Sequence, residues 1–337
     1  MARPYGLLRA GFPYLKTLGM RRLTNFPVDI TLGAEGRMFV LCRQEGTAMV
    51  RKYSLNDEDG GEFGEFGEEE GNLQWPVAIT SDSEENVLIS DEAAHTISSF
   101  DRDGKFLGSF GERGAGQGQL NRPAGLALDD EENIYVVDSM NHRVQKLTKE
   151  GKFILAWGSR GNGDGQFNMP WGITVDELGD VYVVDWRNDR VQKFGPDGEF
   201  IMKFGRSGSS NGEFNRPTDV AVDLDGDIYV CDRGNNRVQL FDSEAQYVEK
   251  FLGDATLSQA ARDYMMTNAG PNRIRDMSVL EPQRLLRGPK SITVDQERRL
   301  FITDTGSYRI QVYKKEAIHL EPHQFGPPRR SVTLNFE

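Results

Sequence analysis

Cysteine, histidine and long apolar runs are scarce in this sequence of 337 residues. Its two cysteines, Cys42 and Cys231, exclude a disulfide-rich scaffold and a cysteine-rich zinc module. No run approaches the ~20 apolar residues of a membrane-spanning helix. Residues 1–18 contain no continuous apolar segment of the kind found in secretory signals. The sequence therefore predicts a cytoplasmic protein without a membrane span.

Basic residues are outnumbered by acidic ones. The chain has 40 Lys and Arg against 52 Asp and Glu, a formal net charge of -12. Duplex nucleic acid is bound through a broad basic surface, which this composition does not supply. The segment 56–71 adds eight acidic residues in sixteen and would repel phosphate nearby. The charge disfavours a nucleic acid partner but leaves room for a local basic face.

Glycine, in contrast, is abundant, and the chain repeats itself. One proline recurs in register at Pro27, Pro76, Pro123, Pro170, Pro217 and Pro289. The steps are 49, 47, 47, 47 and 72 residues, and the last equals one repeat plus 25 residues. Fifteen residues after these prolines stand Cys42, Asp91, Asp138, Asp185, Asp232 and Asp304. A register that persists through six units indicates a repeat architecture.

Each unit holds four short runs rich in Val, Ile, Tyr and Phe, separated by turn residues; in the fourth unit they are 172–175, 181–184, 190–194 and 200–204. Four strands in ~47 residues match one blade of a β-propeller. Six units predict an all-β, six-bladed propeller over residues 1–315. The sixth unit lacks a fourth strand, and a matching run stands at 14–19. The N-terminal strand is therefore predicted to complete the last blade and close the ring.

A polar signature follows the second strand of most units. The pattern Asp-x-x-Asn-x-Arg-Val-Gln occurs at 138–145, 185–192 and 232–239, and 304–311 keeps its Asp, Arg and Gln. With Pro-x-Gly-Ile-Thr-Val-Asp upstream, the chain resembles the NHL repeat family of six-bladed propellers over about residues 11–315. An active site is needed once, whereas a structural contact is needed in every blade. We therefore interpret the recurring Asp and Arg as a clamp across the loop between strands two and three.

Strand direction predicts which loops share a face of the ring. The loops between strands two and three and the connections between blades must lie together, on what we call the loop-rich face. Binding residues are commonly found in such varied loops. The candidates for a binding face are Arg122, His142, Trp171, Trp186, Arg187, Arg216, Arg233 and Tyr308. By resemblance, some NHL propellers bind single-stranded RNA here, and aromatic side chains among arginines suit that ligand.

A second candidate site lies at the axis. Alternation along the first strands points a set of mostly small residues toward it: Asp29, Ala78, Gly125, Gly172, Asp219 and Ser291. Asp29, Asp219 and Ser291 fall on neighbouring blades, with Lys290 beside them. Calcium-dependent propeller lactonases use carboxylates at such a mouth. The arc is either an axial ligand or cation site, or a set of loop caps around a water-filled axis.

Enzyme signatures are weak. The propeller lyase that cleaves peptidyl-hydroxyglycine is more distantly similar and uses a central zinc held by histidines, some directly after the repeat proline. Those positions here are Val28, Val77, Ala124, Trp171, Thr218 and Lys290, and none supplies an imidazole. His95 and His142, on adjacent blades, are either a two-histidine metal site or ordinary loop residues. We predict no catalytic residue, metal or cofactor.

Three segments stand apart from the repeat pattern. Residues 223–227, Asp-Leu-Asp-Gly-Asp, resemble the start of a calcium loop but coincide with a turn found in every unit, which favours a plain hairpin. Residues 255–286 form an insertion between blades five and six with helical spacing, capped by Thr256 or Ser258. It should project on the loop-rich face, as a helix packed on the ring or as a docking element or lid. Residues 316–337 predict an extended tail, and 331–336 alternate like a strand.

The sequence as a whole favours a non-catalytic scaffold that recognises a protein partner through the loop-rich face, suited to a subunit of a larger complex. Two alternatives stay open. One is an enzyme or small-ligand propeller, lyase-like or lactonase-like, with its site at the axis. The other is binding of single-stranded RNA on the loop-rich face, which the net charge disfavours.

Overall fold

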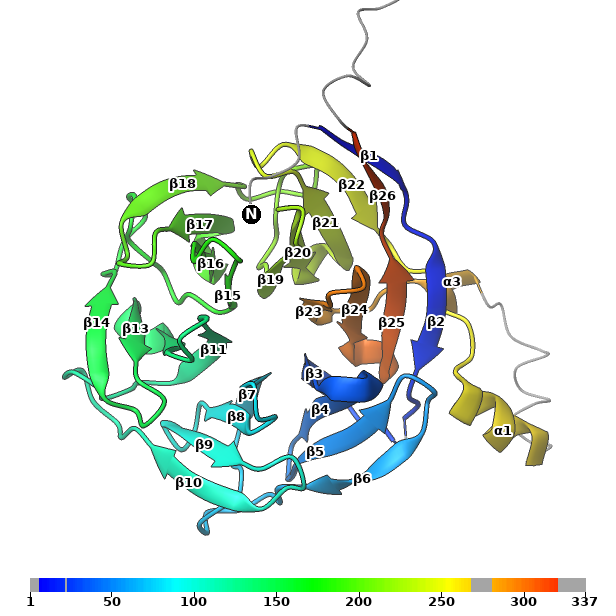
Figure 1. Ribbon diagram of the computed structural model, residues 1–337, viewed down its shortest axis with the longest axis horizontal. Coiled ribbons are helices and arrows are strands. Elements are labelled where there is room, and N and C mark those ends of the chain that lie inside the picture. The colour runs from blue at the N-terminus through cyan, green and yellow to red at the C-terminus, as the bar shows by residue number, and fades with distance from the viewer. Residues whose placement is uncertain (1–5, 22, 268–280, 321–337) are drawn as a thin grey trace, which may run out of the picture.

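The computed structural model describes residues 6–21, 23–267 and 281–320. They form a closed ring of six four-stranded antiparallel sheets around a central axis (Figure 1). The prediction of an all-β, six-bladed propeller is confirmed. In each blade the first strand lies innermost and the fourth lies at the rim, so the first strands together surround the axis.

Blades one to three follow the chain in order. Blade one consists of β3 (Pro27–Leu32), β4 (Arg37–Gln44), β5 (Thr47–Ser54) and β6 (Asp59–Phe63). Blade two consists of β7 (Pro76–Ser81), β8 (Val87–Asp91), β9 (Thr96–Phe100) and β10 (Phe106–Phe110). Blade three consists of β11 (Pro123–Leu128), β12 (Ile134–Asp138), β13 (Arg143–Leu147) and β14 (Phe153–Trp157).

Blades four to six continue the pattern. Blade four consists of β15 (Ile173–Val175), β16 (Val181–Asp185), β17 (Arg190–Phe194) and β18 (Phe200–Phe204). Blade five consists of β19 (Asp219–Val222), β20 (Ile228–Asp232), β21 (Arg237–Phe241) and β22 (Tyr247–Phe251). Blade six consists of β23 (Pro289–Val294), β24 (Arg299–Asp304), β25 (Arg309–Lys314) and β2 (Tyr14–Leu18).

The ring closes through the N-terminal strand, as predicted. Strand β2 pairs antiparallel with β25, so that Tyr14 lies opposite Tyr313 and Leu18 opposite Ile310. The first and last repeats of the chain thus share one sheet. This pairing leaves no open edge at the junction of the chain ends.

The hydrophobic core is divided into six clusters, each between two neighbouring blades of the described structure. The β-branched and aromatic residues of the middle strands supply most of it, because they fit the faces of a pleated sheet. At the closing junction, Leu18 of β2 packs with Ile30 of blade one and Phe301 of blade six. Each blade is therefore stabilised mainly by the blades on either side.

Short 3-10 turns shape the loop-rich face. They follow the second strand in four blades as η2 (Ser139–Asn141), η3 (Trp186–Asn188), η4 (Arg233–Asn235) and η5 (Thr305–Ser307); a fifth, η1 (Ala34–Gly36), lies in the β3–β4 turn. Each of the four ends on a residue in the left-handed conformation, with φ between 49° and 58°. These residues direct the chain into the third strand.

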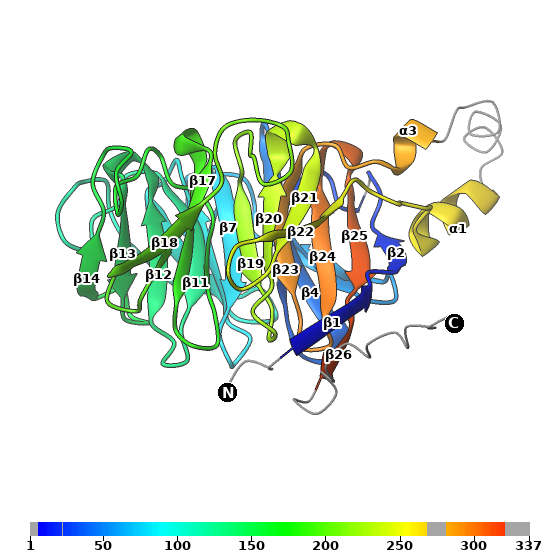
Figure 2. The ribbon, with the colours of Figure 1, turned by 90° about the horizontal axis from the view of Figure 1, so that it is seen from above.

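A two-stranded sheet lies outside the ring. Strand β1 (Gly6–Gly11) pairs antiparallel with β26 (Glu316–Leu320), the first part of the predicted tail. Figure 2 shows the pair along the lower edge of the ring, on the face opposite the loop-rich one. The strand-like alternation at 331–336 lies outside the described residues.

The described parts of the insertion lie at the rim of the ring. Its helix α1 (Gln259–Thr267) lies beyond the rim beside β2, and the short α3 (Glu281–Arg284) lies near the upper edge (Figures 1 and 2). Ser258 caps α1 by accepting the N–H of Ala261 at 3.1 Å, and the N–H of Ala260 donates to Asp57 of blade one at 2.5 Å. These contacts hold α1 at the rim of blades six and one, and the projection of the insertion on the loop-rich face stays a prediction. No helix in the described ranges is long and apolar enough to cross a membrane.

Candidate functional site

The recurring signature is a structural clamp, which confirms the interpretation of the repeat. In blade three, Oδ1 of Asp138 accepts the N–H of Asn121 at 2.7 Å, and its Oδ2 accepts Asn141 and Arg143 at 2.8 Å each. Arg143 also donates to the carbonyl of Gly116 at 2.7 Å. Blades four and five repeat these contacts around Asp185 and Asp232. The Asp and Arg are therefore occupied in holding the loops and are not available for chemistry.

The left-handed residue that ends each loop caps the entry to the next blade. Nδ1 of His142 accepts the N–H of Met169 at 3.1 Å, and Nδ1 of His95 accepts the N–H of Arg122 at 3.0 Å. Asp189 and Asn236 accept the equivalent N–H groups, at 2.6 and 2.7 Å. An accepting Nδ1 is unprotonated. Burial lowers the pKa of both histidines, which agrees with this role. His95 and His142 are thus inter-blade contacts of neutral imidazoles.

Four predicted binding residues come together near the axis. Trp171 and Trp186 lie with their ring centroids 5.9 Å apart. The guanidinium groups of Arg187 and Arg216 lie 5.3 and 5.7 Å from the ring of Trp186. Trp171 also lines the axial cavity, so the group begins at the axis and extends outward over blades four and five.

The remaining predicted candidates have separate partners. Arg122 forms an ion pair with Glu92 at 3.5 Å. The ring of Tyr308 packs edge-on against Phe26 at 4.6 Å, with Arg21 5.4 Å from it. His142 is the inter-blade contact described above. Arg233 opens η4, close to Gly288 at the entry to blade six.

Sequence reasoning missed Arg43 and Trp75. The guanidinium of Arg43 lies 4.3 Å from the ring of Trp75 and donates to the carbonyl of Pro76 at 2.9 Å. The register contained the signal, because Arg43 directly follows Cys42, as Trp186 and Arg233 directly follow their signature aspartates.

Basic side chains gather at the end of the axis on the loop-rich face. Burial lowers the pKa of Lys290 well below its ordinary value, and the charges of Arg43 and Arg233 lower it further. Burial also lowers the pKa of Arg43 to about 10. Within the described ranges, five cations of this region form no ion pair with a carboxylate: Arg43, Arg187, Arg216, Arg233 and Lys290. We call these five residues the cationic mouth.

The four predicted axial residues, Asp29, Asp219, Lys290 and Ser291, line one cavity directly beneath the mouth. The cavity measures about 20 Å³, room for roughly one water molecule. Asp29 accepts the N–H of Ile79 at 2.8 Å, and Asp219 accepts the N–H of Ile292 at 2.9 Å. Each carboxyl group therefore ties its own blade to the next.

The axial carboxyl groups are hard to ionise. Burial raises the pKa of Asp29 to about 6. Burial and the charge of Asp29 raise the pKa of Asp219 well above its ordinary value. Close backbone packing keeps the cavity small, since a Cβ on Gly172 would lie 2.6 Å from the carbonyl oxygen of Thr218. The cavity has no space for an organic substrate.

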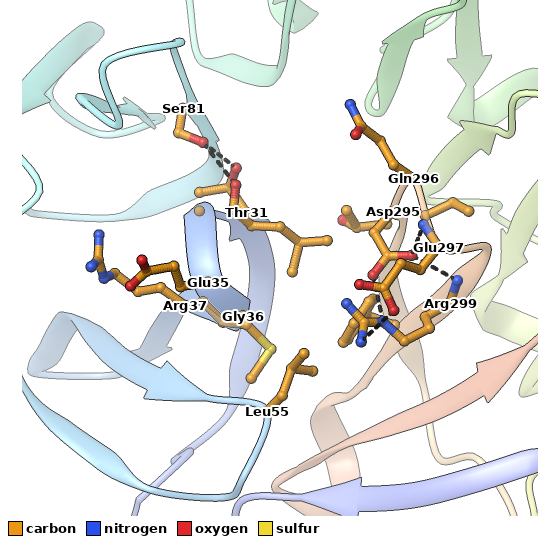
Figure 3. Close-up of a pocket in the computed structure, with 16 residues that line it drawn as sticks. Thr31, Glu35, Gly36, Arg37, Leu55, Ser81, Asp295, Gln296, Glu297 and Arg299 are labelled. Atoms are coloured by element: carbon orange, nitrogen blue, oxygen red, sulfur yellow. Dashed lines mark hydrogen bonds and ion pairs between the residues drawn. The ribbon is translucent and has the colours of Figure 1, made fainter.

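A larger recess opens at the other end of the axis (Figure 3). It measures about 580 Å³ and lies between the β3–β4 and β23–β24 turns. Arg299 pairs there with Asp295 at 2.6 Å and with Glu297 at 3.1 Å, and the hydroxyls of Thr31 and Ser81 bond to each other at 2.8 Å. Most of its charged groups thus neutralise one another, in contrast to the cationic mouth.

The calcium-like turn of blade five holds a lysine. Nζ of Lys315, fully buried, lies 2.7 Å from Asp223, 2.7 Å from Asp225 and 2.9 Å from Asp227. Arg9 of β1 pairs with Asp227, and Arg298 pairs with Asp225 at 3.2 Å. Three cations match three carboxylates. The hairpin prediction is confirmed, since Asp223 accepts the N–H of Asp227 across the turn at 3.0 Å.

Among the residues described, no group of three His, Cys, Asp or Glu is placed to hold a metal ion.

The fold and the repeated clamp define a class: a six-bladed propeller built from polar-clamped repeats. A protein-family model described as NHL repeat matches residues 120–147, 167–194 and 214–241, the clamp regions of blades three, four and five. The chain is therefore a six-bladed propeller in which blades three, four and five contain NHL repeats. Blades one and two, where Cys42, Met49 and Thr96 replace signature residues, lie outside the matched segments.

Solved structures with the same fold include lyases. A streptogramin B lyase is 13% identical, with a TM-score of 0.56, over 90% of this chain and 88% of that chain. An inactive virginiamycin B lyase from Staphylococcus aureus, solved with quinupristin, is 15% identical, with a TM-score of 0.57, over 90% of this chain and 99% of that one. A protein of unknown function from Bacteroides thetaiotaomicron is 17% identical, with a TM-score of 0.59, over 91% and 73%. These identities show a shared fold alone. No curated protein matches the sequence.

Proposed function

We propose that this propeller is a non-catalytic platform that recognises a protein partner through its loop-rich face. The observation that carries the proposal is the cationic mouth, five cations without a described carboxylate partner in a chain of net charge -12. Lys149, in a turn of the opposite face, is by contrast closely paired, since its Nζ lies 2.9 Å from Asp82 and 2.7 Å from Glu132. Arginine and tryptophan are also the residues enriched in the energetic centres of protein interfaces.

The axis supports binding better than catalysis. Its carboxyl groups are engaged with backbone N–H groups of the next blade, and its cavity is smaller than any organic substrate. Ligand sites for small molecules usually measure ~300–1,000 Å³. The proposal includes the cytoplasmic location and the division into a propeller (1–315) and a tail (316–337), both of which stay predictions.

Paired variants of the two faces test the proposal. The tagged protein would be used to capture partners from cells of its source, beside a loop-face variant (Arg187→Ala, Arg216→Ala, Arg233→Ala) and an opposite-face variant (Glu35→Ala, Gln296→Ala, Glu297→Ala). We expect one set of proteins to be retained by the wild type and the opposite-face variant and lost by the loop-face variant. Loss with the opposite-face variant instead would overturn the proposal.

A further inference from the structure

We propose that the cationic mouth binds an acidic peptide segment of the partner, with one Asp or Glu carboxylate seated over the axis between Arg43, Arg233 and Lys290. The inference rests on the proposed function and adds the chemistry of the partner. Three features support it: the basic side chains of the mouth without a carboxylate partner, the tryptophans beside them, and the acidic connection between blades one and two.

The charge at the axis calls for an anion. Arg43, Arg233 and Lys290 come from three consecutive blades of the closed ring, blades one, five and six. The carboxyl group of Asp29 beneath them is bound to two backbone N–H groups, those of Ile30 and Ile79, both at 2.8 Å. Like charges brought together with partial burial repel one another, and an anion placed between them relieves that repulsion.

The tryptophans prepare the outer arginines for the same ligand. Arg187 and Arg216 both lie against the ring of Trp186, and Arg43 lies against Trp75. A guanidinium beside an aromatic ring can still donate N–H groups to the two oxygens of a carboxylate. Further acidic residues of the same peptide would therefore find partners a short distance from the axis.

The rim of the loop-rich face favours a compact acidic peptide over RNA. Exposed carboxylates gather on the connection between blades one and two, at Glu68, Glu69 and Glu70. A single-stranded RNA carries a phosphate on every nucleotide and follows long positive grooves, so this acidic connection would repel it on the side of blades one and two. A short peptide can place its carboxylates within the mouth alone.

Binding of a fluorescein-labelled hexaglutamate peptide to the full chain tests the inference. Fluorescence anisotropy would be measured for the wild type and for Lys290→Met, Arg43→Met and Arg233→Met. The matched control is Arg160→Met, which removes an exposed cation from a connection on the same face. We expect each mouth variant to weaken binding about tenfold or more and the control to change it less than about twofold, because charge-assisted hydrogen bonds are lost only in the former.

Competition distinguishes the sources of negative charge. Unlabelled hexaglutamate should displace the probe, whereas inorganic phosphate and hexauridylate at the same total charge should not. Equal affinity of the wild type and the mouth variants, or stronger competition by either of the other anions, would overturn the inference. Since Lys290 is partly buried, the thermal unfolding of Lys290→Met would be compared with that of the wild type. If Lys290→Met does not fold, the peptide affinity of Arg233→Met, which replaces an exposed residue, tests the inference instead.

The two experiments distinguish failure of the acidic-peptide inference from failure of the proposed function. If hexaglutamate does not bind at the mouth but the loop-face variant still loses its captured partners, the partner does not bind through an acidic segment, and the function as a protein-binding platform is retained. If the captured partners depend on the opposite face, both proposals are wrong.

Discussion

At the scale of single residues, the positions around the axis are set by what the next blade requires. Gly172 permits the backbone of blade five to approach, because any Cβ there would meet the carbonyl of Thr218. Asp29 and Asp219 instead reach across to backbone N–H groups. Aspartate at such a position is costly to ionise, since burial opposes its charge.

Replacement of Asp219 by Asn should change stability in a pH-dependent way. The pKa of Asp219 is raised on folding, so the native state holds this proton more tightly than the unfolded state, and native stability falls as pH rises above the unfolded value of ~3.9. The amide of the variant would keep an oxygen acceptor for Ile292 and has no proton to lose. We expect Asp219→Asn to gain stability relative to the wild type between about pH 5 and about pH 8. Urea unfolding of both proteins at the two pH values gives the difference in their free energies of unfolding. A difference that is the same at both pH values would contradict the prediction.

Replacement of His142 by Asn should act in the opposite sense. Burial lowers the pKa of His142 below that of the unfolded chain, so its contribution is complete above ~6.5 and declines as pH falls. Asn236 makes the same contact in blade five, so His142→Asn should keep the bond and remove that decline. His142→Ala should lose about 1 kcal/mol even at about pH 8. Thermal unfolding would be measured from about pH 5 to about pH 8. If His142→Asn lost as much stability at low pH as the wild type does, His142 would not be the source of that loss.

At the scale of elements, the repeat register predicted most of the structure. The blades, the closing strand and the clamp follow from residue types at fixed spacing, which local propensity and turn chemistry determine. Contacts between blades were harder, because the partner of His142 lies 27 residues away and is a backbone group without a sequence signature. The lysine among the three aspartates could not be predicted, since it lies 92 residues from Asp223 and outside the repeat.

The β1–β26 sheet gives the clearest prediction at this scale. Burial opposes the charge on Lys315, but Asp223 and Asp227 outweigh it and raise the pKa of the ammonium. Removal of one partner of a buried charge network leaves the others unbalanced, so Lys315→Met should cost about 3–5 kcal/mol. The neighbouring Lys314 is exposed, and Lys314→Met should change stability by less than about 0.5 kcal/mol. Lys315 lies between β25 and β26. Similar unfolding midpoints for the two variants would show that the contacts of Lys315 with the aspartates do not stabilise the protein.

At the scale of the whole molecule, the ring depends on the closing strand. Leu18 is fully buried between blades six and one, whereas Leu15 of the same strand is 42% exposed. A carboxylate at position 18 would be buried without a partner and should destabilise the protein by about 3 kcal/mol or more. Leu18→Asp should therefore lower the thermal midpoint strongly and expose the edge of β25, with aggregation as a consequence. Leu15→Asp is the control and should leave both nearly unchanged.

The charge distribution also has meaning at this scale. A group of basic side chains in a protein of net charge -12 would attract anionic groups to one point of its surface. The opposite end of the axis has the larger recess, but its charges are mostly paired. Size alone would select the recess as the binding surface, whereas the function proposed above follows the basic side chains of the loop-rich face.

Hydrogen–deuterium exchange with and without hexaglutamate tests the central claim most directly. The account predicts slower exchange at residues 43–47, 233–236 and 288–291, which surround the cationic mouth, and no change at 33–37 or 295–299 around the recess. Protection confined to the recess, with the mouth unaffected, would contradict it.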